Sequence, residues 1–250
     1  MNINRLIPCL TILDGKLIKT KNFDLRDCFY IGDVINAVRI FNEKKVEELI
    51  IQDIGATIRG CEPDYNLINK ISNITRMPIT YGGGIKNISQ ARKIISLGVE
   101  KISISSAAID NPKFIFDLSN EFGNQSISLT LDVKKINNDH KVFTHNANRN
   151  TYLSPIQVYK SCENFIGEIV INSIDKDGSM LGPDYELLEN LYDELKVPMI
   201  IMGGIGNIDD IKNIYNRYPV IGVSCGSLFL FKGSKRAVLI NYPKENIFDI

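Results

Sequence analysis

Two stretches of the chain, Pro78-Ile-Thr-Tyr-Gly-Gly-Gly-Ile85 and Pro198-Met-Ile-Ile-Met-Gly-Gly-Ile205, share one pattern and start 120 residues apart. In each, a short apolar run ends in glycines, which is typical of a buried strand followed by a turn. The same spacing of 120 relates Glu48-Leu-Ile-Ile-Gln-Asp53 to Glu168-Ile-Val-Ile-Asn-Ser173, and it holds for a third pair of segments that begins at residue 103. We infer that the two halves of the chain are an internal repeat.

Along the rest of the chain, short apolar runs alternate with longer segments of helical periodicity. The expected strands are residues 6–12, 48–54, 78–81, 101–104, 126–133, 168–174, 198–202 and 220–223, and the expected helices are residues 34–45, 64–74, 89–97, 112–121, 156–163, 185–194 and 209–216. Strands that alternate with helices form a parallel sheet, which is open or closed. Two halves with four strands each close naturally into one barrel. We predict an α/β protein, a (β/α)8 TIM barrel with an internal half-barrel repeat, formed by residues 1–250 as a single domain.

The composition excludes several classes of function. Of the 250 residues, 44% are hydrophobic and 23% are charged, and the formal net charge is zero. A neutral chain has no general electrostatic attraction for nucleic acid or for anionic membranes. The sequence contains no apolar stretch of the ~20 residues that a membrane-spanning helix needs, and its start lacks a signal-peptide pattern. We expect a cytoplasmic protein.

Cysteine and histidine residues show no metal-binding spacing. The five cysteines are scattered, and His140 and His145 lie in a polar stretch that we expect to be a surface loop. We predict free thiols in a reducing compartment, and neither a metal ion nor a redox cofactor.

A long connection follows the first expected strand, at residues 14–33. A structureless segment of this length within a compact domain is usually a functional lid or disordered. Because the loops that follow barrel strands surround the catalytic face, we expect an irregular lid there.

Glycines and serines at four strand ends predict two phosphate-binding sites. Glycines follow the third and seventh strands, and serines follow the fourth and eighth; these residues are Gly82, Gly83, Gly84, Gly203, Gly204, Ser105, Ser106 and Ser227. Glycine lets the backbone approach a ligand closely, and its N–H group can bind phosphate oxygens. A single glycine run could equally be a tight turn, but the duplicated set favours two phosphates on one elongated substrate.

Carboxylates at strand ends are the next candidates. Asp132 follows a fully apolar strand, so we expect its side chain at the mouth of the barrel. A carboxylate in that place can take up or release a proton of a bound substrate. We predict this role for Asp132.

Charged residues mark the opposite rim of the barrel. Arg5, Glu48, Lys101 and Glu168 stand at or just before the starts of strands one, two, four and six. Their side chains would form a ring of alternating charge at the bottom of the barrel. Position alone favours a salt-bridge cluster that stabilises the fold.

Together these segments resemble the cyclase subunit of imidazole glycerol phosphate synthase, HisF. The similarity covers nearly the whole chain and is carried by Arg5-Leu-Ile-Pro-Cys-Leu10, Asp14-Gly-Lys-Leu-Ile-Lys19, Tyr81-Gly-Gly-Gly-Ile85, Lys101-Ile-Ser-Ile-Ser-Ser-Ala-Ala108 and Ser173-Ile-Asp-Lys-Asp-Gly-Ser179. The resemblance implies that a HisH-like glutaminase docks on the amino-terminal rim as a heterodimer partner. It further implies that ammonia passes along the barrel axis to a small phosphorylated substrate.

The resemblance also implies roles for individual residues. The charged ring becomes the gate of the ammonia channel, in place of a salt-bridge cluster, and Glu100 falls at the glutaminase interface. Lys19 matches a lysine of the mobile first loop, and Asp132 matches one of two catalytic aspartates. The implied phosphate sites are Gly84, Ser105 and Ser106 for one phosphate, and Gly178, Gly204 and Ser227 for the other. The family commonly has Asn-Thr where this chain has Ser105-Ser106.

One departure from the family concerns catalysis directly. The family's other catalytic aspartate stands at the end of the first strand, where this chain has Thr11. A threonine hydroxyl does not titrate near neutral pH, so it cannot replace a carboxylate in proton transfer. Efficient ring closure is therefore not expected.

Two further segments depart in the same direction. A first loop that is two residues longer, with Cys28-Phe-Tyr-Ile-Gly-Asp33, and the ending Arg236-Ala-Val-Leu-Ile-Asn-Tyr-Pro243 resemble a HisF-like branch associated with glycosyl amidation. Members of that branch work in surface-polysaccharide or nonulosonate synthesis. They deliver ammonia from a HisH-like glutaminase to a sugar amidotransferase, and they tend to lack the first aspartate.

Three interpretations of function remain. The chain is an ammonia-conducting subunit in sugar amidation, or the cyclase of histidine biosynthesis, or the related sugar-phosphate isomerase of that pathway. The isomerase also needs the first aspartate and has no use for a charged gate. We favour sugar amidation, because it explains Thr11 and uses every residue of the ring.

Overall fold

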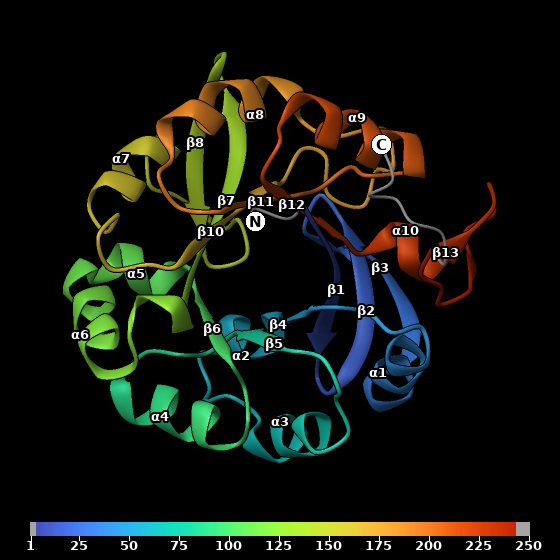
Figure 1. Ribbon diagram of the computed structural model, residues 1–250, viewed down its shortest axis with the longest axis horizontal. Coiled ribbons are helices and arrows are strands. Elements are labelled where there is room, and N and C mark those ends of the chain that lie inside the picture. The colour runs from blue at the N-terminus through green and yellow to red at the C-terminus, as the bar shows by residue number, and fades with distance from the viewer. Residues whose placement is uncertain (1–3, 244–250) are drawn as a thin grey trace.

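Eight parallel strands close into a barrel in the computed structural model, which describes residues 4–243 (Figure 1). They are β1 (Arg5–Leu13), β4 (Leu49–Asp53), β5 (Ile79–Gly82), β6 (Lys101–Ile104), β7 (Ile127–Ile136), β10 (Glu168–Ser173), β11 (Met199–Met202) and β12 (Ile221–Cys225). Each strand pairs with the next in this order, and β12 pairs with β1, where Arg5 lies opposite Gly222. The predicted TIM barrel is confirmed.

Helices surround the ring of strands (Figure 1). They are α1 (Val34–Glu43), α2 (Ile54–Arg59), α3 (Tyr65–Ser72), α4 (Ile88–Ser96), α5 (Ser106–Asp110), α6 (Pro112–Phe122), α7 (Pro155–Lys160), α8 (Tyr185–Leu191), α9 (Ile208–Arg217) and α10 (Ser227–Leu230), with 3-10 turns at Asn124–Ser126 and Tyr192–Glu194. Side-chain caps determine where several of them begin. Ser154 forms a capping box at the start of α7, and Asn207 forms one at the start of α9. The seven expected helices are present. The short helices α2, α5 and α10 were not expected, because six residues or fewer show no apolar period.

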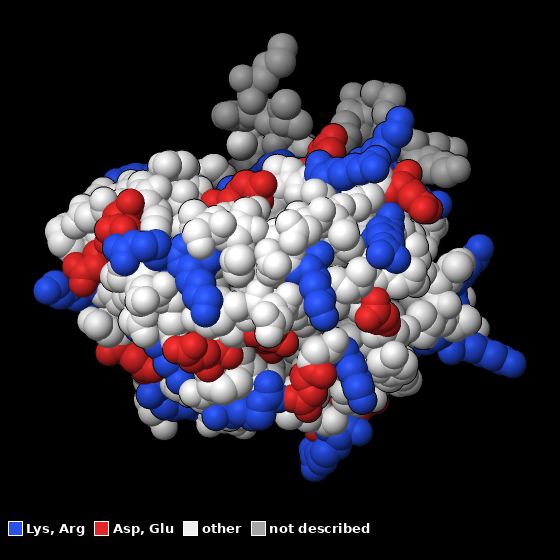
Figure 2. Space-filling view, turned by 90° about the horizontal axis from the view of Figure 1, so that it is seen from below, with Lys and Arg blue, Asp and Glu red and all other residues white. Residues whose placement is uncertain are grey.

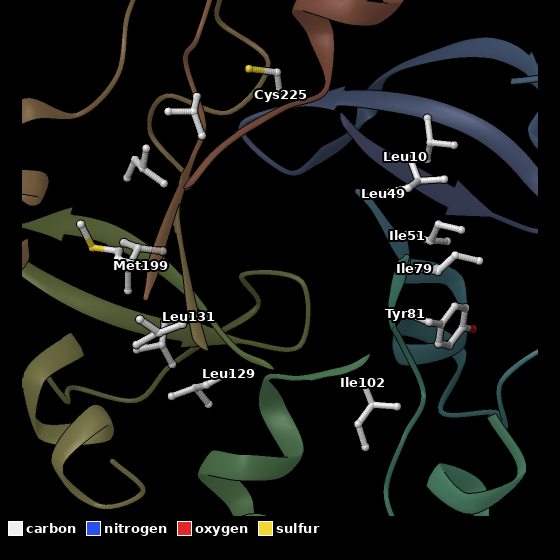
Figure 3. Packing of buried hydrophobic residues seen from close by; sticks show 14 of the residues in the cluster. Leu10, Leu49, Ile51, Ile79, Tyr81, Ile102, Leu129, Leu131, Met199 and Cys225 are labelled. Atoms are coloured by element: carbon white, nitrogen blue, oxygen red, sulfur yellow. The ribbon is translucent and has the colours of Figure 1, made fainter. Parts of the chain in front are cut away.

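The hydrophobic core has two parts, since successive side chains of a strand point to opposite faces. The larger part lies between strands and helices. Figure 3 shows part of it around the barrel, with Leu10 on β1, Ile51 on β4 and Leu129 on β7 among the labelled residues. The smaller part fills the barrel interior and consists of Ile7, Cys9, Ile50, Val170, Ile200 and Met202. Along each strand, every second side chain thus points into the lumen and the others point to the helices. This alternation determines which side chains reach the two open ends of the barrel.

The connection after β1 differs from the irregular lid that we expected. It is an antiparallel hairpin of β2 (Lys16–Lys21) and β3 (Asp24–Asp33), and β2 also pairs with β1. The buried run Leu17-Ile-Lys-Thr20 and the sequence Cys28-Phe-Tyr-Ile31 carry the β-branched and aromatic residues typical of strands. The expectation of an irregular segment was wrong, because it was based on the length of the connection.

A second hairpin was also missed. The chain continues from β7 into β8 (Asp139–Thr144) and β9 (Arg149–Asn150), and a short pair of β13 (Phe231–Lys232) and β14 (Ala237–Val238) lies near the end of the described chain. His140 therefore lies on a strand with a buried side chain, and only His145 lies in a turn. The expected surface loop was wrong for His140.

Several findings apply to residues 4–243 as a whole. The five cysteines are free thiols, and no group of three or more metal-binding side chains occurs in this part of the chain. None of its helices has the length and apolar character to cross a membrane. Figure 2 shows acidic and basic side chains interspersed over one face of the barrel, with no large area of a single charge.

Candidate functional site

A cavity of about 670 Å³ opens at the carboxyl ends of the barrel strands. All residues predicted for catalysis or phosphate binding except Gly82 line it: Thr11, Lys19, Gly83, Gly84, Ser105, Ser106, Asp132, Gly178, Gly203, Gly204 and Ser227. These residues come from β1, the β2–β3 hairpin, β7 and the loops after five strands, so only closure of the barrel brings them together. The cavity is the candidate active site.

Thr11 and Asp132 face the cavity from opposite sides of the barrel. Their strands, β1 and β7, are four strands apart in either direction around the ring. Asp132 is held by Asn172, whose side-chain amide donates a hydrogen bond of 3.1 Å to Oδ1 of Asp132. The pair is a consequence of strand register, because Asn172 on β10 lies directly beside Asp132 on β7. The site thus has one oriented carboxylate and, across from it, a neutral hydroxyl.

The carboxyl group of Asp132 holds its proton more tightly than an ordinary aspartate does. Removal from bulk water raises the pKa of the carboxyl from 3.8 to about 7; the hydrogen bond from Asn172 opposes this shift, and the negative charge of Asp177 adds to it. A group with a pKa near 7 exchanges protons readily at neutral pH. Asp132 is therefore suited to general acid and base chemistry.

Replacing Asp132 by asparagine is expected to stabilise the protein at pH 8. A carboxyl with a raised pKa in the folded state favours folding most when protonated, so its contribution is lost as pH rises from about 4 to 7. Asp132→Asn should raise the free energy of unfolding at pH 8 by roughly 2–4 kcal/mol, and by less at pH 5. Urea unfolding at both pH values measures the difference. The exposed Asp193→Asn serves as control, and unchanged or lower stability of Asp132→Asn at pH 8 contradicts the prediction.

Lys19 reaches the cavity from the β2–β3 hairpin. Its ammonium forms an ion pair of 2.6 Å with Oδ1 of Asp177, and both side chains are buried. A backbone hydrogen bond from Asn22 to the carbonyl of Asp177 ties the same hairpin to the loop after β10. The hairpin therefore covers one side of the cavity in a defined position.

Two ends of the cavity carry the predicted phosphate-binding residues. Gly204 has φ +88°, and a Cβ there would lie 2.1 Å from the carbonyl oxygen of Gly182, so close backbone packing requires glycine. The hydroxyls of Ser105 and Ser227 are buried and have no hydrogen-bond partner among the described residues. Such hydroxyls are free to bind oxygens of a ligand. The backbone N–H of His145 donates to the Ser106 hydroxyl, an interaction that sequence reasoning missed.

The four charged residues at the amino-terminal rim form one network. Nη1 of Arg5 lies 3.1 Å from Oε2 of Glu48 and 3.0 Å from Oε2 of Glu168. Nζ of Lys101 lies 2.8 Å from the same oxygen of Glu168 and 3.8 Å from Oε2 of Glu48. The side chains cross the lower end of the lumen, as the predicted ring of alternating charge requires.

Glu168 is the central acid of this network. Burial alone would raise the pKa of its carboxyl, but the Lys101 ammonium and the Arg5 guanidinium outweigh burial and hold the pKa below its ordinary value. The neighbouring Glu100 is exposed on the same rim, where its carboxylate accepts a hydrogen bond of 2.7 Å from the backbone N–H of Ile79. Glu168 is thus ionised at neutral pH, and Glu100 is accessible beside the ring.

Sequence reasoning missed the polar partners of Asp132 and Lys19. Asn172 was treated only as part of an apolar strand, and Asp177 was not recognised as the partner of Lys19. The available signal for Asn172 was the alternation along β10, which places it on the same face as Glu168. No local pattern could have paired Lys19 with Asp177, which lies 158 residues away.

Comparisons with known proteins identify the family. The family model for "Histidine biosynthesis protein" matches residues 5–235. A protein of Leptospira interrogans provisionally named imidazole glycerol phosphate synthase subunit HisF is 47% identical over 251 residues, covering 98% of both chains. A Pseudomonas aeruginosa protein provisionally named subunit hisF2 is 45% identical, again over 98% of both chains. The imidazole glycerol phosphate synthase subunit HisF of Sulfolobus acidocaldarius is 37% identical over 86% of both chains.

The span of the family model, residues 5–235, contains the eight barrel strands, the cavity and the charged ring. The most similar of the three relatives is nearly half identical along its full length. The chain therefore belongs to the histidine biosynthesis protein family and, within it, to the HisF-type subunits of imidazole glycerol phosphate synthase.

Proposed function

We propose that this HisF-type subunit receives ammonia through its barrel and serves the amidation of a surface sugar in the cytoplasm, with little capacity for imidazole ring closure. A single observation carries the proposal: Thr11 faces Asp132 across the cavity while the charged ring at the opposite end is complete. The barrel keeps what an ammonia conduit needs and lacks one of two proton-transfer groups.

The chemistry of Thr11 supports weak ring closure. Closing an imidazole ring requires several proton movements between substrate and protein, and two carboxylates on opposite sides can give and take protons in turn. Here Asp132 can do so, but the Thr11 hydroxyl stays neutral throughout the physiological pH range. Loss of one proton-transfer group typically slows a reaction by ~10²–10⁴-fold.

The amino-terminal rim supports a partner that supplies ammonia. A ring of two cations and two anions has no net charge. When it opens, its side chains can exchange one ion-pair partner for another, and no charge needs to stay buried without a partner. A HisH-like glutaminase docked against the rim, with Glu100 at the interface, would supply new partners for these side chains. The ring would then act as a gate between the glutaminase and the lumen.

The ammonia that reaches the cavity would pass to a further protein. A sugar amidotransferase would use it and transfer the nitrogen to a sugar.

The alternative is a functional cyclase of histidine biosynthesis. The cavity favours it, since both glycine and serine ends, Asp132 and the Lys19–Asp177 pair are in place. Thr11 opposes it, and so does the resemblance of the first loop and of residues 236–243 to the amidation branch. The two functions therefore differ in one measurable quantity, the rate of ring closure.

Ring closure with free ammonia distinguishes the two functions. The purified chain is supplied with ammonium salt and the phosphoribulosyl-formimino nucleotide of the histidine pathway, and imidazole product is measured beside the Sulfolobus acidocaldarius subunit as reference. We expect product formation ~10²–10⁴-fold slower than with the reference. Turnover within a few-fold of the reference would overturn the proposal in favour of the cyclase.

A further inference from the structure

Polar side chains line much of the barrel lumen. The inner faces of β5, β6, β7, β10 and β12 carry buried hydroxyl and amide side chains, namely Thr80, Ser103, Ser128, Thr130, Asn172 and Ser224. Apolar residues lie between them, namely Ile7, Cys9, Ile50, Val170, Ile200 and Met202. Ser128 lies beside Glu168 of the charged ring, and Asp132 stands on the same face of β7 two positions above Thr130. The polar side chains of β7 thus run from the ring to the cavity.

Several polar atoms of the lumen have no hydrogen-bond partner within residues 4–243. They are the hydroxyls of Ser128 and Ser224, both fully buried, and the carbonyl Oδ1 of Asn172. A buried polar atom without a partner destabilises a protein, so such atoms mark places where a small polar ligand binds. Ser128 lies beside the charged ring, whereas Asn172 and Ser224 both line the cavity, on two strands separated by β11.

Of the two that line the cavity, Asn172 is the one directly beside Asp132. Its side chain is 7% exposed, and its amide nitrogen donates to Asp132. Because the amide nitrogen is the atom bonded to Asp132, the carbonyl oxygen of the same group is left for another partner. Asn172 thereby presents an acceptor to the point where the lumen meets the cavity.

A ligand that binds between Asn172 and Asp132 must be small and must donate hydrogen bonds. Asn172 offers a carbonyl oxygen, and Asp132 offers its second carboxylate oxygen, since only Oδ1 is bonded to Asn172. A phosphate or a carbonyl group brings only acceptors and does not fit. Ammonium, with four N–H donors and one positive charge, can satisfy both oxygens at once.

We propose that Asn172 and Asp132 form an exit site that holds nitrogen as ammonium where the lumen opens into the cavity. This inference rests on the proposed function, because ammonia must reach the lumen. On arrival, ammonia takes the proton of the Asp132 carboxyl and becomes ammonium beside a carboxylate. Return of that proton to Asp132 frees the nitrogen lone pair for attack on an acceptor.

The surroundings of the site suit this exchange. Asp132 has a pKa of about 7, so it can both give a proton and recover it near neutral pH. Among the other charged residues that line the cavity, Lys19 and Asp177 are paired with each other and together carry no net charge. Ammonium is therefore held by Asp132 and Asn172 without direct competition from an unpaired lysine.

The experiment uses the free chain with ammonium chloride as the probe, without glutaminase or nucleotide. Backbone N–H signals of Asp132 and Val133 are followed by NMR at constant ionic strength. Ammonium should shift them saturably, while sodium chloride and tetramethylammonium chloride should not. Because Asn172→Leu removes the acceptor, it should weaken ammonium binding about tenfold or more.

Two further variants complete the test. Asn172→Thr keeps a polar side chain that is too short to bridge to Asp132, so it should also weaken binding and serves if Asn172→Leu fails to fold. The exposed Asn73→Leu should leave binding unchanged. Equal shifts with sodium chloride, or full ammonium affinity in Asn172→Leu or Asn172→Thr, would overturn the exit site. Neither outcome affects the ring-closure assay, so failure of the site and failure of the proposed function are separable.

Discussion

Replacing Thr11 by aspartate is expected to raise the rate of imidazole formation from free ammonia by about 10²–10⁴-fold. Thr11 lies at the cavity end of β1, opposite Asp132, and its side chain is only partly buried. Aspartate is close to threonine in volume, so it can occupy the position without large repacking. The new carboxylate would supply the second proton-transfer group that the cavity lacks.

Two controls separate proton transfer from other effects. Thr11→Asn has the shape of aspartate but does not titrate, so its rate should stay at the level of the wild-type chain. In the double variant Thr11→Asp with Asp132→Asn, the gain should disappear, because one carboxylate is again missing. Product formation is measured with saturating ammonium and nucleotide. If Thr11→Asp gives no gain, the shape of the cavity has diverged as well, and position 11 is not the reason for weak ring closure.

Replacing Glu168 by alanine is expected to reduce glutamine-dependent product formation by roughly tenfold or more, and to leave the free-ammonia reaction within about twofold. Glu168 is 3% exposed and bonds both Arg5 and Lys101, so its loss leaves two partly buried cations without their shared partner. The side chains must then rearrange at the entrance of the lumen. Only ammonia that enters through the ring is affected by this change.

The comparison requires a glutaminase partner and a matched control. Both reactions are measured with a HisH-like glutaminase present, once with glutamine and once with ammonium salt, in the wild-type and Thr11→Asp backgrounds. Glu121→Ala removes an exposed ion pair with Arg92 on the outside of the barrel and should change neither rate. Because loss of Glu168 is also expected to cost about 3–5 kcal/mol of stability, folding is checked by thermal unfolding. Equal loss in both reactions would argue against a channel.

The pH dependence of stability links these results to the cavity. If Asp132→Asn stabilises the protein at pH 8, the wild-type chain keeps a carboxylate that costs stability, and proteins retain such groups at functional sites. Thr11 carries no such cost, because a neutral hydroxyl is readily accommodated in a partly buried position. The two positions that face each other therefore differ in stability as well as in chemistry.

The sequence alone was sufficient for the barrel and for the positions of most candidate residues. The repeat at a spacing of 120 residues gave the closed topology, and strand ends gave Gly84, Gly204, Ser105 and Asp132. In a parallel barrel all carboxyl ends of strands lie on one face, so a residue at a strand end is placed in space by its position in the chain. The same rule placed the charged ring on the other face.

Local pattern did not predict the two hairpins. Residues 14–33 and the segment that contains His140 were expected to be loops, because long polar connections usually are. They form strands since their edges pair with β1 and β7, whose cavity-side ends extend beyond their barrel neighbours. Pairing between strands depends on the neighbour that the fold supplies, and not on the segment itself.

What the sequence determined by itself is the barrel and the absence of a carboxylate at position 11. What only the tertiary structure decided is which side chains meet. Lys19 pairs with Asp177, Asn172 orients Asp132, and Thr11 faces Asp132 across the cavity. These contacts join residues far apart in the chain and arise from strand register and from closure of the ring. Register and closure depend on all eight strands at once, because each strand buries its apolar side chains against its neighbours.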